Sequence, residues 1–383
     1  MNLAYKDVKQ NLARFLLTAA GIGFLLMAAI GMIGVYRGIV EDALLVINKV
    51  GADLWIVQGE RDGPFAESSS IASHIDQRAA GLTGVEKVRR FVQFSQQFAH
   101  EGKSLRASIT GLDYPTDSGE WFALTNGRYI QSGHFEAIAD AATGLSLGAK
   151  VRLGKDDFTI VGTTRGMVDP SGDGMVFVTI NDATAIASTR TSEQVLLARA
   201  KTGTIATQGS VSQDSKIAAV LITLSPGASL ETVRASAMRW GDVNVITQNE
   251  QRDLLLNKRL ARLRTQILAF TGVLLVVTAI VVSLIIYTLT MEKRNQIALL
   301  KLIGARDSVI INMIAQEAAL IGLSGFGLAL IIANLLFPLF PRRVAMMPAD
   351  LGTLFVFLAL ICALASWVGI AQAMKIRAQE VLS

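Results

Sequence analysis

Four long apolar stretches divide the chain into parts that resemble membrane spans and one part that resembles a globular domain. The stretches cover residues 15–36, 267–289, 309–337 and 351–372. A hydrocarbon core about 30 Å thick needs about 20 helical residues, so each stretch is long enough to cross a bilayer. The first stretch exceeds the roughly 7 to 15 apolar residues of a cleavable signal peptide, so we expect an uncleaved anchor. With four spans, both termini lie on one side of the membrane.

Between the first and second spans, the pattern changes to short β-rich runs separated by Gly, Asp and Asn. It predicts strands at residues 53–57, 104–110, 158–161, 175–180 and 218–224. Helices are predicted at residues 135–144 and 230–240, the second of them with Ser229 as its cap. Residues 166–174 and 203–213 are predicted to be loops. This mixture indicates an α+β domain.

The sequence therefore predicts a membrane protein with four transmembrane α-helices and a large α+β extracytoplasmic domain inserted between helices 1 and 2. The expected order is an amphipathic cytoplasmic helix (1–14), the first transmembrane helix (15–40), the extracytoplasmic domain (41–250), a stalk helix joined to the second transmembrane helix (251–289), a cytoplasmic segment (290–308), the third transmembrane helix (309–337), an outer loop (338–350), the fourth transmembrane helix (351–374) and a cytoplasmic tail (375–383). Residues 251–271 contain no Gly or Pro, so we expect one uninterrupted, stiff helix there.

Basic residues mark the side of the membrane on which the termini lie. They are Lys6, Lys9 and Arg14 before the first span, Lys293, Arg294, Lys301 and Arg306 between the second and third spans, and Lys375 and Arg377 after the fourth. The positive-inside rule places these three segments in the cytoplasm. A basic run at residues 258–264 opposes this orientation, and we interpret it as a helix leaving the membrane with its charges at headgroup level.

Composition supports a chain that lies largely in lipid. Hydrophobic residues make up 51% of it, charged residues 17%, and the mean hydropathy is +0.44. The net charge of +5 does not indicate nucleic-acid binding, because Lys and Arg cluster at membrane ends and not on one soluble face. Cys362 is the only cysteine in the sequence, so no intrachain disulfide can form.

No motif in the sequence indicates catalysis. Residues 144–150 lack the spacing of a Walker A motif, and residues 68–70 lack the Gly-x-Ser-x-Gly frame of a nucleophilic serine. His74, His100 and His134 follow no metal-ligand spacing. We therefore expect no catalytic residue, no metal site and no cofactor bound by this chain.

The cytoplasmic connector between the second and third spans has an amphipathic pattern. Its apolar positions are Ile297, Leu300, Leu302 and Ile303, and its charged positions include Glu292, Arg294 and Lys301. This pattern predicts a short helix at a membrane surface, followed by a turn at Gly304. The alternative is a charged loop that only fixes the topology.

This connector resembles the coupling helix of permease subunits of FtsX and MacB-like ABC transporters, which reads Glu-x-Arg-x-x-Ile-x-x-x-Lys-x-x-Gly-Ala. The residues that the resemblance assigns to ATPase coupling are Glu292, Lys293, Arg294, Ile297, Leu300, Lys301, Gly304, Ala305 and Arg306. Residues 11–22 are similar to the start of the family's first span, and residues 127–128, 147–162 and 176–183 to its periplasmic core domain. The likeness covers nearly the whole chain. The family often has proline where Gly369 and Ala378 align, which is a departure.

The resemblance implies a MacB/FtsX-like (type VII ABC) permease in the bacterial inner membrane. It implies a homodimer that works with two copies of a separate ABC ATPase subunit, and ATP and Mg would be bound by that ATPase. Residues 51–57 look closest to DevC-like adaptor-linked exporters, whose partners include a periplasmic membrane-fusion adaptor and an outer-membrane TolC-like channel.

Two functions fit this family, and a third is disfavoured. The first is export of hydrophobic or amphipathic cargo by mechanotransmission, in which ATP-driven motion is relayed to the extracytoplasmic domain. The alternative is an FtsX-type regulator that activates an outer-face cell-wall enzyme and transports nothing. A secondary transporter is disfavoured because no inverted repeat of spans is visible.

Small and polar residues within the spans suggest further contacts. Gly31 and Gly34 in the first span, and Gly322 and Gly325 in the third, suit close helix packing, either within one chain or between two copies. Gln316 and Glu317 lie about two turns into the third span. A charge in lipid costs at least about 2.5 kcal/mol, so we expect Glu317 to pair with Arg306 or Lys301 at headgroup level, or to take part in transport or coupling.

Overall fold

The computed structural model describes residues 12–188, 216–340 and 342–374. The chain divides into two compact units. We call them the helical unit, which holds described residues 12–38, 263–340 and 342–374, and the sheet unit, which holds described residues 39–188 and 216–262. The predicted N-terminal helix lies almost entirely outside the described residues, and the predicted loop at 203–213 and the tail at 375–383 lie wholly outside them.

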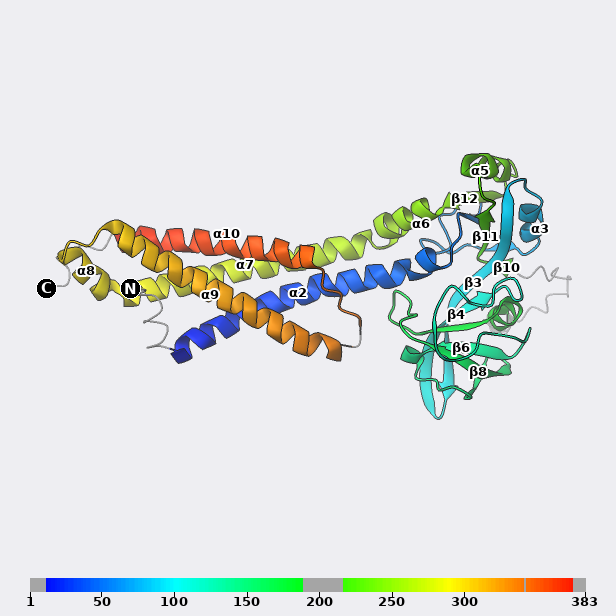
Figure 1. Ribbon diagram of the computed structural model, residues 1–383, viewed down its shortest axis with the longest axis horizontal. Helices are drawn as coiled ribbons and strands as arrows, with labels where there is room; N and C mark the ends of the chain where they lie inside the picture. Colours follow the sequence, from blue (N-terminus) through cyan, green and yellow to red (C-terminus); the bar gives the residue numbers. More distant parts are fainter. Residues whose placement is uncertain (1–11, 189–215, 341, 375–383) are drawn as a thin grey trace, which may run out of the picture. The chain divides into compact units, whose positions relative to one another are not determined.

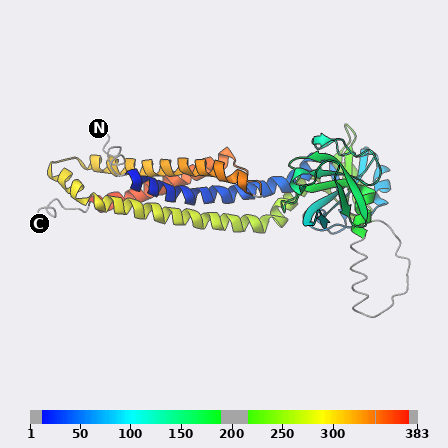
Figure 2. The same cartoon turned by 90° about the horizontal axis from the view of Figure 1, so that it is seen from below.

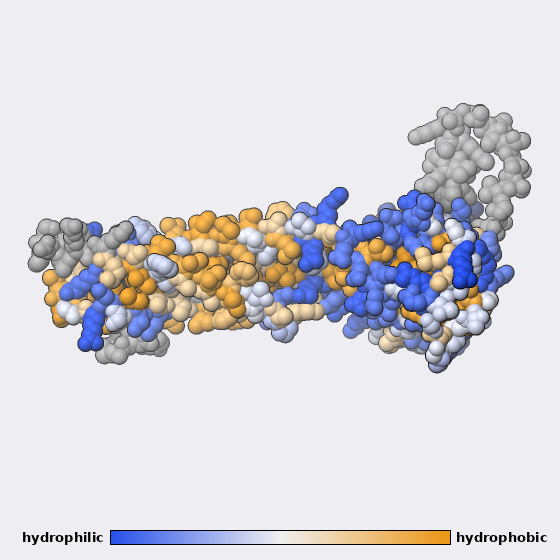
Figure 3. Space-filling view, turned by 90° about the horizontal axis from the view of Figure 1, so that it is seen from above, coloured by the Kyte–Doolittle hydropathy of each residue, from blue (hydrophilic) through white to orange (hydrophobic). Residues whose placement is uncertain are grey.

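Helices that are long and apolar enough to cross a membrane form the helical unit. The four are the first part of α2 (Leu12–Lys49), α7 (Ala261–Glu292), α9 (Asp307–Leu336) and α10 (Pro348–Met374). They lie side by side (Figures 1 and 2). A short helix, α8 (Arg294–Leu302), connects α7 to α9, and a 3-10 turn, η3 (Phe337–Leu339), follows α9. The face of this unit seen in Figure 3 is predominantly apolar, as contact with lipid requires.

Glycines set the close spacing of these helices. A Cβ atom added at Gly325 of α9 would lie 2.9 Å from Cγ2 of Ile22 in α2, and one at Gly322 would lie 2.7 Å from Sγ of Cys362 in α10. In α2, a Cβ atom at Gly31 would lie 3.3 Å from the Phe337 ring. These glycines therefore make packing contacts within the chain, and a contact between two copies stays a prediction.

The connection between η3 and α10 packs against α2. The amide of Ala345 donates to the carbonyl of Gly34 at 3.0 Å, and a Cβ atom at Gly34 would lie 2.5 Å from Cγ1 of Val344. The Arg37 guanidinium forms a two-bond fork with the Asp350 carboxylate, with both N–O distances 2.7 Å. This end of the helical unit is therefore held by a planar ion pair in addition to close packing.

A ten-stranded mixed sheet is the centre of the sheet unit. Its strand order is β12-β1-β11-β3-β4-β9-β6-β8-β5, and β7 pairs with β8. The strands are β1 (Leu54–Gln58), β3 (Val85–His100), β4 (Lys103–Leu112), β5 (Leu124–Gly127), β6 (Glu136–Asp140), β7 (Lys150–Leu153), β8 (Asp156–Thr164), β9 (Met175–Thr179), β11 (Ala219–Leu224) and β12 (Val243–Thr247). A separate pair joins β2 (Ile71–Ala72) to β10 (Lys216–Ile217).

Both faces of this sheet are buried near β1. Leu54 and Ile56 belong to one hydrophobic cluster, whereas Trp55 and Val57 belong to another. Alternate residues of a strand point to opposite faces, which explains why β1 is a continuous apolar run and not an alternating one. Short helices accompany the sheet: α3 (Ile75–Ala80), η1 (Ala141–Thr143), a helix at residues 180–188, α5 (Leu230–Met238) and α6 (Gln248–Leu254).

The end of α2 is joined to the sheet by a buried arginine. Nη2 of Arg89, on β3, donates to the carbonyl of Val50 at 2.7 Å, and Nη1 lies 3.1 Å from the Asp117 carboxylate. A guanidinium next to the free carbonyls at a helix C-terminus is favourable. The last turns of α2 are thereby fixed to β3.

The structure confirms most predicted elements of the sheet unit and corrects one. The five predicted strands correspond to β1, β4, β8, β9 and β11, and the predicted helix at 230–240 corresponds to α5. The helix predicted at 135–144 is wrong, because that segment forms β6 and η1. Its Ala-rich sequence favours helix locally, but β6 pairs with both β8 and β9, and this tertiary pairing overrides the local preference.

The uninterrupted helix predicted at 251–271 is also wrong. α6 ends at Leu254, residues Leu255–Arg259 form a π-helical turn that we call η2, and α7 begins at Ala261. The amide of Leu260 donates to the carbonyl of Leu255 at 2.9 Å, the wide hydrogen bond of a π-turn. Absence of Gly and Pro removes two common causes of interruption, but it does not prevent a π-turn.

Candidate functional site

A buried ion pair joins the connector to a membrane-crossing helix. Lys293 lies between the end of α7 and the start of α8, and its Nζ lies 2.8 Å from both Oε1 and Oε2 of Glu317 on α9. Each side chain is only 11% exposed. Glu317 is ten residues beyond the start of α9 at Asp307, about 15 Å along the helix at 1.5 Å per residue. At such a depth a carboxylate needs a partner, and Lys293 provides it.

The expected partner of Glu317 was wrong. We expected Arg306 or Lys301 because they are close to Glu317 in sequence, but the carboxylate bonds to Lys293. Lys301 turns instead toward the end of α10, where its Nζ donates to the carbonyls of Ala373 at 3.2 Å and Met374 at 3.1 Å. A cation at a helix C-terminus is favourable, so Lys301 holds α8 against α10. Gln316, the other polar residue predicted here, is exposed.

The two faces of α8 differ sharply. Ile297 and Ala298 are fully buried, and Leu300 is half-buried. The other face is exposed and combines apolar with charged side chains. Leu299 is 54% exposed, Leu302 48% and Ile303 77%. We call the exposed set the connector surface: Glu292, Arg294, Leu299, Leu302, Ile303 and Arg306.

Gly304 ends α8 in a left-handed conformation. Its φ is +83°, and the amide of Ala305 donates to the carbonyl of Leu300 at 3.0 Å. The Gly304 amide donates to the carbonyl of Lys301 at 3.1 Å. This is the arrangement in which glycine is favoured after a helix. Arg306 follows in an extended conformation and caps α9 with its backbone.

The sequence singled out the connector but not the pairings within it. Lys293 was predicted only as one member of a charged helix, and no spacing rule connects it with a carboxylate 24 residues away. The ion pair of Arg37 and Asp350 was likewise missed, because their sequence separation is 313. The one available signal was indirect: each is a charged residue near the end of an apolar stretch, where a partner is required.

Among residues 12–188, 216–340 and 342–374, no group of three or more His, Cys, Asp or Glu side chains is arranged to hold a metal. The geometry thus describes a multi-pass membrane protein with an α+β unit inserted after the first membrane-crossing helix and a folded connector between the second and third.

Comparison with known families agrees with this description. The MacB-like periplasmic core domain matches residues 15–239, and the FtsX-like permease C-terminal domain matches residues 268–378. The first match alone covers more than half of the chain. The chain therefore belongs to the FtsX/MacB-like family of ABC transporter permeases, and the family named from its sequence motifs is confirmed.

Solved structures with similarity to this chain come from several bacteria. The extracellular domain of the noncanonic ABC-type transporter YknZ from Gram-positive bacteria is 14% identical, with a TM-score of 0.34; the match covers 51% of this chain and 99% of that one. The periplasmic region of MacB from Actinobacillus actinomycetemcomitans is 12% identical, with a TM-score of 0.39, and the match covers 55% of this chain and 96% of that one. A domain of a permease protein from Porphyromonas gingivalis is 15% identical, with a TM-score of 0.28, and the match covers 51% of this chain and 86% of that one. No curated protein matches the sequence.

Proposed function

We propose that this chain is the permease subunit of an ABC transporter whose separate ATPase subunit docks on the connector surface. The observation that carries the proposal is the exposure of Leu299, Leu302 and Ile303 beside charged residues of the same short helix. α8 is nine residues long, too short to span a bilayer, so its apolar face needs another partner. A mixed apolar and charged face is the usual composition of a protein–protein contact.

The buried face of α8 supports a relay of motion from such a partner. Lys293 bonds to Glu317 of α9, Lys301 bonds to the end of α10, and α7 ends next to Lys293. A displacement of α8 therefore acts on three membrane-crossing helices at once. Charge-assisted hydrogen bonds with buried partners resist separation more than surface ion pairs do.

In the proposed mechanism, this motion reaches the sheet unit through α2 and α7 and exports hydrophobic or amphipathic cargo. Two copies of the chain would work with two ATPase subunits, which bind ATP and Mg. The sheet unit would lie outside the bacterial inner membrane, and both termini in the cytoplasm. A periplasmic adaptor and a TolC-like outer-membrane channel would complete the path. The family to which the chain belongs supports this assignment.

Site-specific photocrosslinking in cells tests the docking. A photoreactive amino acid at Ile303 should yield an adduct that mass spectrometry identifies as an ABC ATPase subunit. Leu335 provides a matched control, because it is also apolar and exposed, at 68%, but lies near the end of α9 away from α8. Absence of an ATPase adduct at Ile303, or an equal yield at Leu335, would contradict the proposal.

Copurification separates export from regulation. Purification of the chain after crosslinking on the outer face should recover a periplasmic membrane-fusion adaptor if the chain is an exporter. Recovery of a cell-wall hydrolase without an adaptor would instead identify an FtsX-type regulator. Both results retain the ATPase contact, so this experiment judges the cargo part of the proposal independently of docking.

A further inference from the structure

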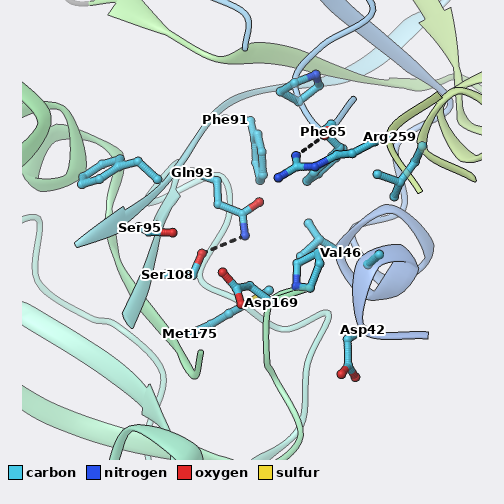
Figure 4. Close-up of a pocket in the computed structure, with 15 residues that line it drawn as sticks. Asp42, Val46, Phe65, Phe91, Gln93, Ser95, Ser108, Asp169, Met175 and Arg259 are labelled. Carbon is cyan, nitrogen blue, oxygen red and sulfur yellow. Dashed lines mark hydrogen bonds between the residues drawn. The ribbon is translucent and has the colours of Figure 1, made fainter. Parts of the chain in front are cut away.

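The sheet unit contains a cavity lined by polar and aromatic side chains. Its volume is about 190 Å³, and it lies between the last turns of α2, the π-turn η2 and strands β3 and β4 (Figure 4). A dry cavity of about 150 Å³ is large enough to bind benzene. This cavity therefore has room for an aromatic ring or a compact apolar group with a few further atoms.

One side of the cavity presents hydrogen-bond acceptors that lack donors. Asp169 is only 6% exposed, and its Oδ1 accepts the amides of Ser171 at 2.8 Å and Asp173 at 3.0 Å. Its Oδ2 has no hydrogen bond within the described part of the chain. Nε2 of Gln93 donates to Oγ of Ser108 at 3.2 Å, which leaves Oε1 of Gln93 without a donor among the described residues. Figure 4 shows these three side chains gathered together.

The hydrogen bonds of the Asp169 carboxylate offset only part of the free-energy cost of its burial. Burial raises the pKa of Asp169 above its ordinary value, and the nearby Asp173 carboxylate adds to the rise. Backbone hydrogen bonds from Asp173 and Ser171, and the nearby Arg106 guanidinium, oppose it. An ionised carboxylate that is buried and has an unused oxygen favours a positively charged hydrogen-bond donor at that position.

Aromatic side chains form another wall. Phe65 and Phe91 both line the cavity, with ring centroids 5.7 Å apart, and Trp55 packs edge-on against both at 5.3 and 5.5 Å. Packed rings of this kind hold one another in place. They offer apolar contact and attract a cation through the negative face of the ring.

The cation that lines the cavity is already occupied by another partner. That cation is Arg259 of η2, and the Arg106 guanidinium near Asp169 pairs with the Asp173 carboxylate at 2.9 Å. Arg259 is exposed, and its Nη1 donates to the backbone carbonyl of Phe65. Its guanidinium is thus already engaged with the loop that carries Phe65, whereas the Asp169 oxygen is not engaged.

From these observations we propose that the cavity binds a small organic cation, with an ammonium group donating to Oδ2 of Asp169 and Oε1 of Gln93 and an aromatic or compact apolar group against Phe65 and Phe91. The inference is independent of the proposed transport function, because it concerns binding to the sheet unit and applies equally to an exporter and a regulator.

Three probes of matched size test the proposal on the full chain in lipid nanodiscs. They are 2-phenylethylamine, a cation at neutral pH, the neutral 2-phenylethanol and the anion phenylacetate. Ligand-observed NMR measures binding, and empty nanodiscs give the contribution of the lipid. We expect the amine to bind at least tenfold more tightly than either other probe.

Variants of the residues that line the cavity test whether the amine binds there. Asp169→Asn keeps an oxygen for the backbone amides but removes the charge, and we expect at least tenfold weaker amine binding. Asp156→Asn is the control, because Asp156 is an exposed residue of β8 that does not line the cavity, and its affinity should stay within twofold of the wild type. If Asp169→Asn loses its cooperative thermal transition, Gln93→Met replaces it; this variant removes the second acceptor and should weaken binding at least threefold.

The proposal is overturned by any of three results. These are equal affinity for the three probes, wild-type affinity for the amine in a folded Asp169→Asn variant or in Gln93→Met, and an amine signal no greater than that from empty nanodiscs.

Discussion

Nζ of Lys293 lies 2.8 Å from each carboxylate oxygen of Glu317, so one lysine joins the turn between α7 and α8 to the interior of α9. The two side chains are equally buried, at 11% exposure each. Buried pairs of this kind add little net stability over apolar residues of the same shape, but loss of one partner leaves an uncompensated charge. The pair therefore fixes the geometry of the connector more than it stabilises the fold.

Removal of one member should be strongly destabilising. In Glu317→Gln, the ammonium of Lys293 stays buried without its counter-ion, and we expect the protein to lose about 3–5 kcal/mol of stability. Thermal melting of the purified protein in one detergent measures the change. The double variant Lys293→Met/Glu317→Leu removes both charges and should melt within a few degrees of the wild type. A wild-type melting temperature for Glu317→Gln alone would show that the pair is not formed.

The effect of a Gly→Ala substitution in α9 on stability should depend on what the new Cβ atom meets. In Gly325→Ala, the new Cβ atom would lie 2.9 Å from Cγ2 of Ile22, so α2 and α9 must move apart; overpacking of this kind costs about 1–3 kcal/mol. Gly327→Ala is the matched control, because nothing lies within 4 Å of its Cβ position. Melting in detergent should show a loss for the first variant and none for the second. Equal effects would contradict the observed helix contact.

The turn at Gly304 should depend on backbone conformation alone. A Cβ atom there meets nothing within 4 Å, but φ is +83°, so Gly304→Ala should cost about 1 kcal/mol through strain. Gly272→Ala provides the comparison, because its Cβ position is equally open and it lies inside helix α7. Hydrogen exchange of the α8 amides should rise in Gly304→Ala and stay unchanged in Gly272→Ala. Unchanged exchange in both variants would argue against a strained turn.

The sheet unit should lose one contribution to its stability in acid. The hydrogen bond from the Arg128 guanidinium, with smaller contributions from the backbone amides of Gln131 and Ser132, lowers the pKa of Glu136 from 4.5 to about 2. Because the folded pKa is the lower one, the contribution is complete above pH 4.5 and disappears as the pH falls toward 2. Glu136→Gln should therefore be less stable than the wild type at pH 6, by about 1 kcal/mol for a pair near the surface, and equally stable near pH 2.

Melting of the wild type and Glu136→Gln between pH 6 and pH 2 measures this difference. Glu86→Gln is the control, because Glu86 is an exposed residue of β3 that forms no ion pair with any described residue. The difference between Glu86→Gln and the wild type should not change with pH. A constant difference for Glu136→Gln as well would mean that its ion pair is absent in solution.

The sequence was sufficient for the membrane-crossing helices, most of the strands and the position of the connector. Long apolar runs and β-rich segments are local signals, so they identify α7, α10, β1 and β11 without knowledge of tertiary contacts. The segment at 135–144 shows where such signals fail. Its local preference for helix is overridden by two neighbouring strands, and nothing within the segment reports them.

Site geometry was predicted less well, because it depends on which residues meet across large separations in sequence. Glu317 was correctly recognised as a residue that needs a partner, but Lys293 and Lys301 could not be told apart as candidates from their spacing. The cavity beside Asp169 gave no signal at all, since α2, β3 and η2 form its walls from distant parts of the chain. A carboxylate in a polar loop, read alone, indicates a solvated turn.

The π-turn at Leu255–Arg259 also changes which deletions the segment leading into α7 can tolerate. A π-turn holds one residue more than the α-helix that would replace it. Deletion of a single residue, such as Asn257, could thus be absorbed by conversion to an ordinary turn, whereas the same deletion within α7 would rotate every later side chain by about 100°. Leu255 and Arg259 belong both to this turn and to the cavity wall. A molecule held in the cavity would therefore touch the π-turn, the point at which the helical register of this segment is adjustable.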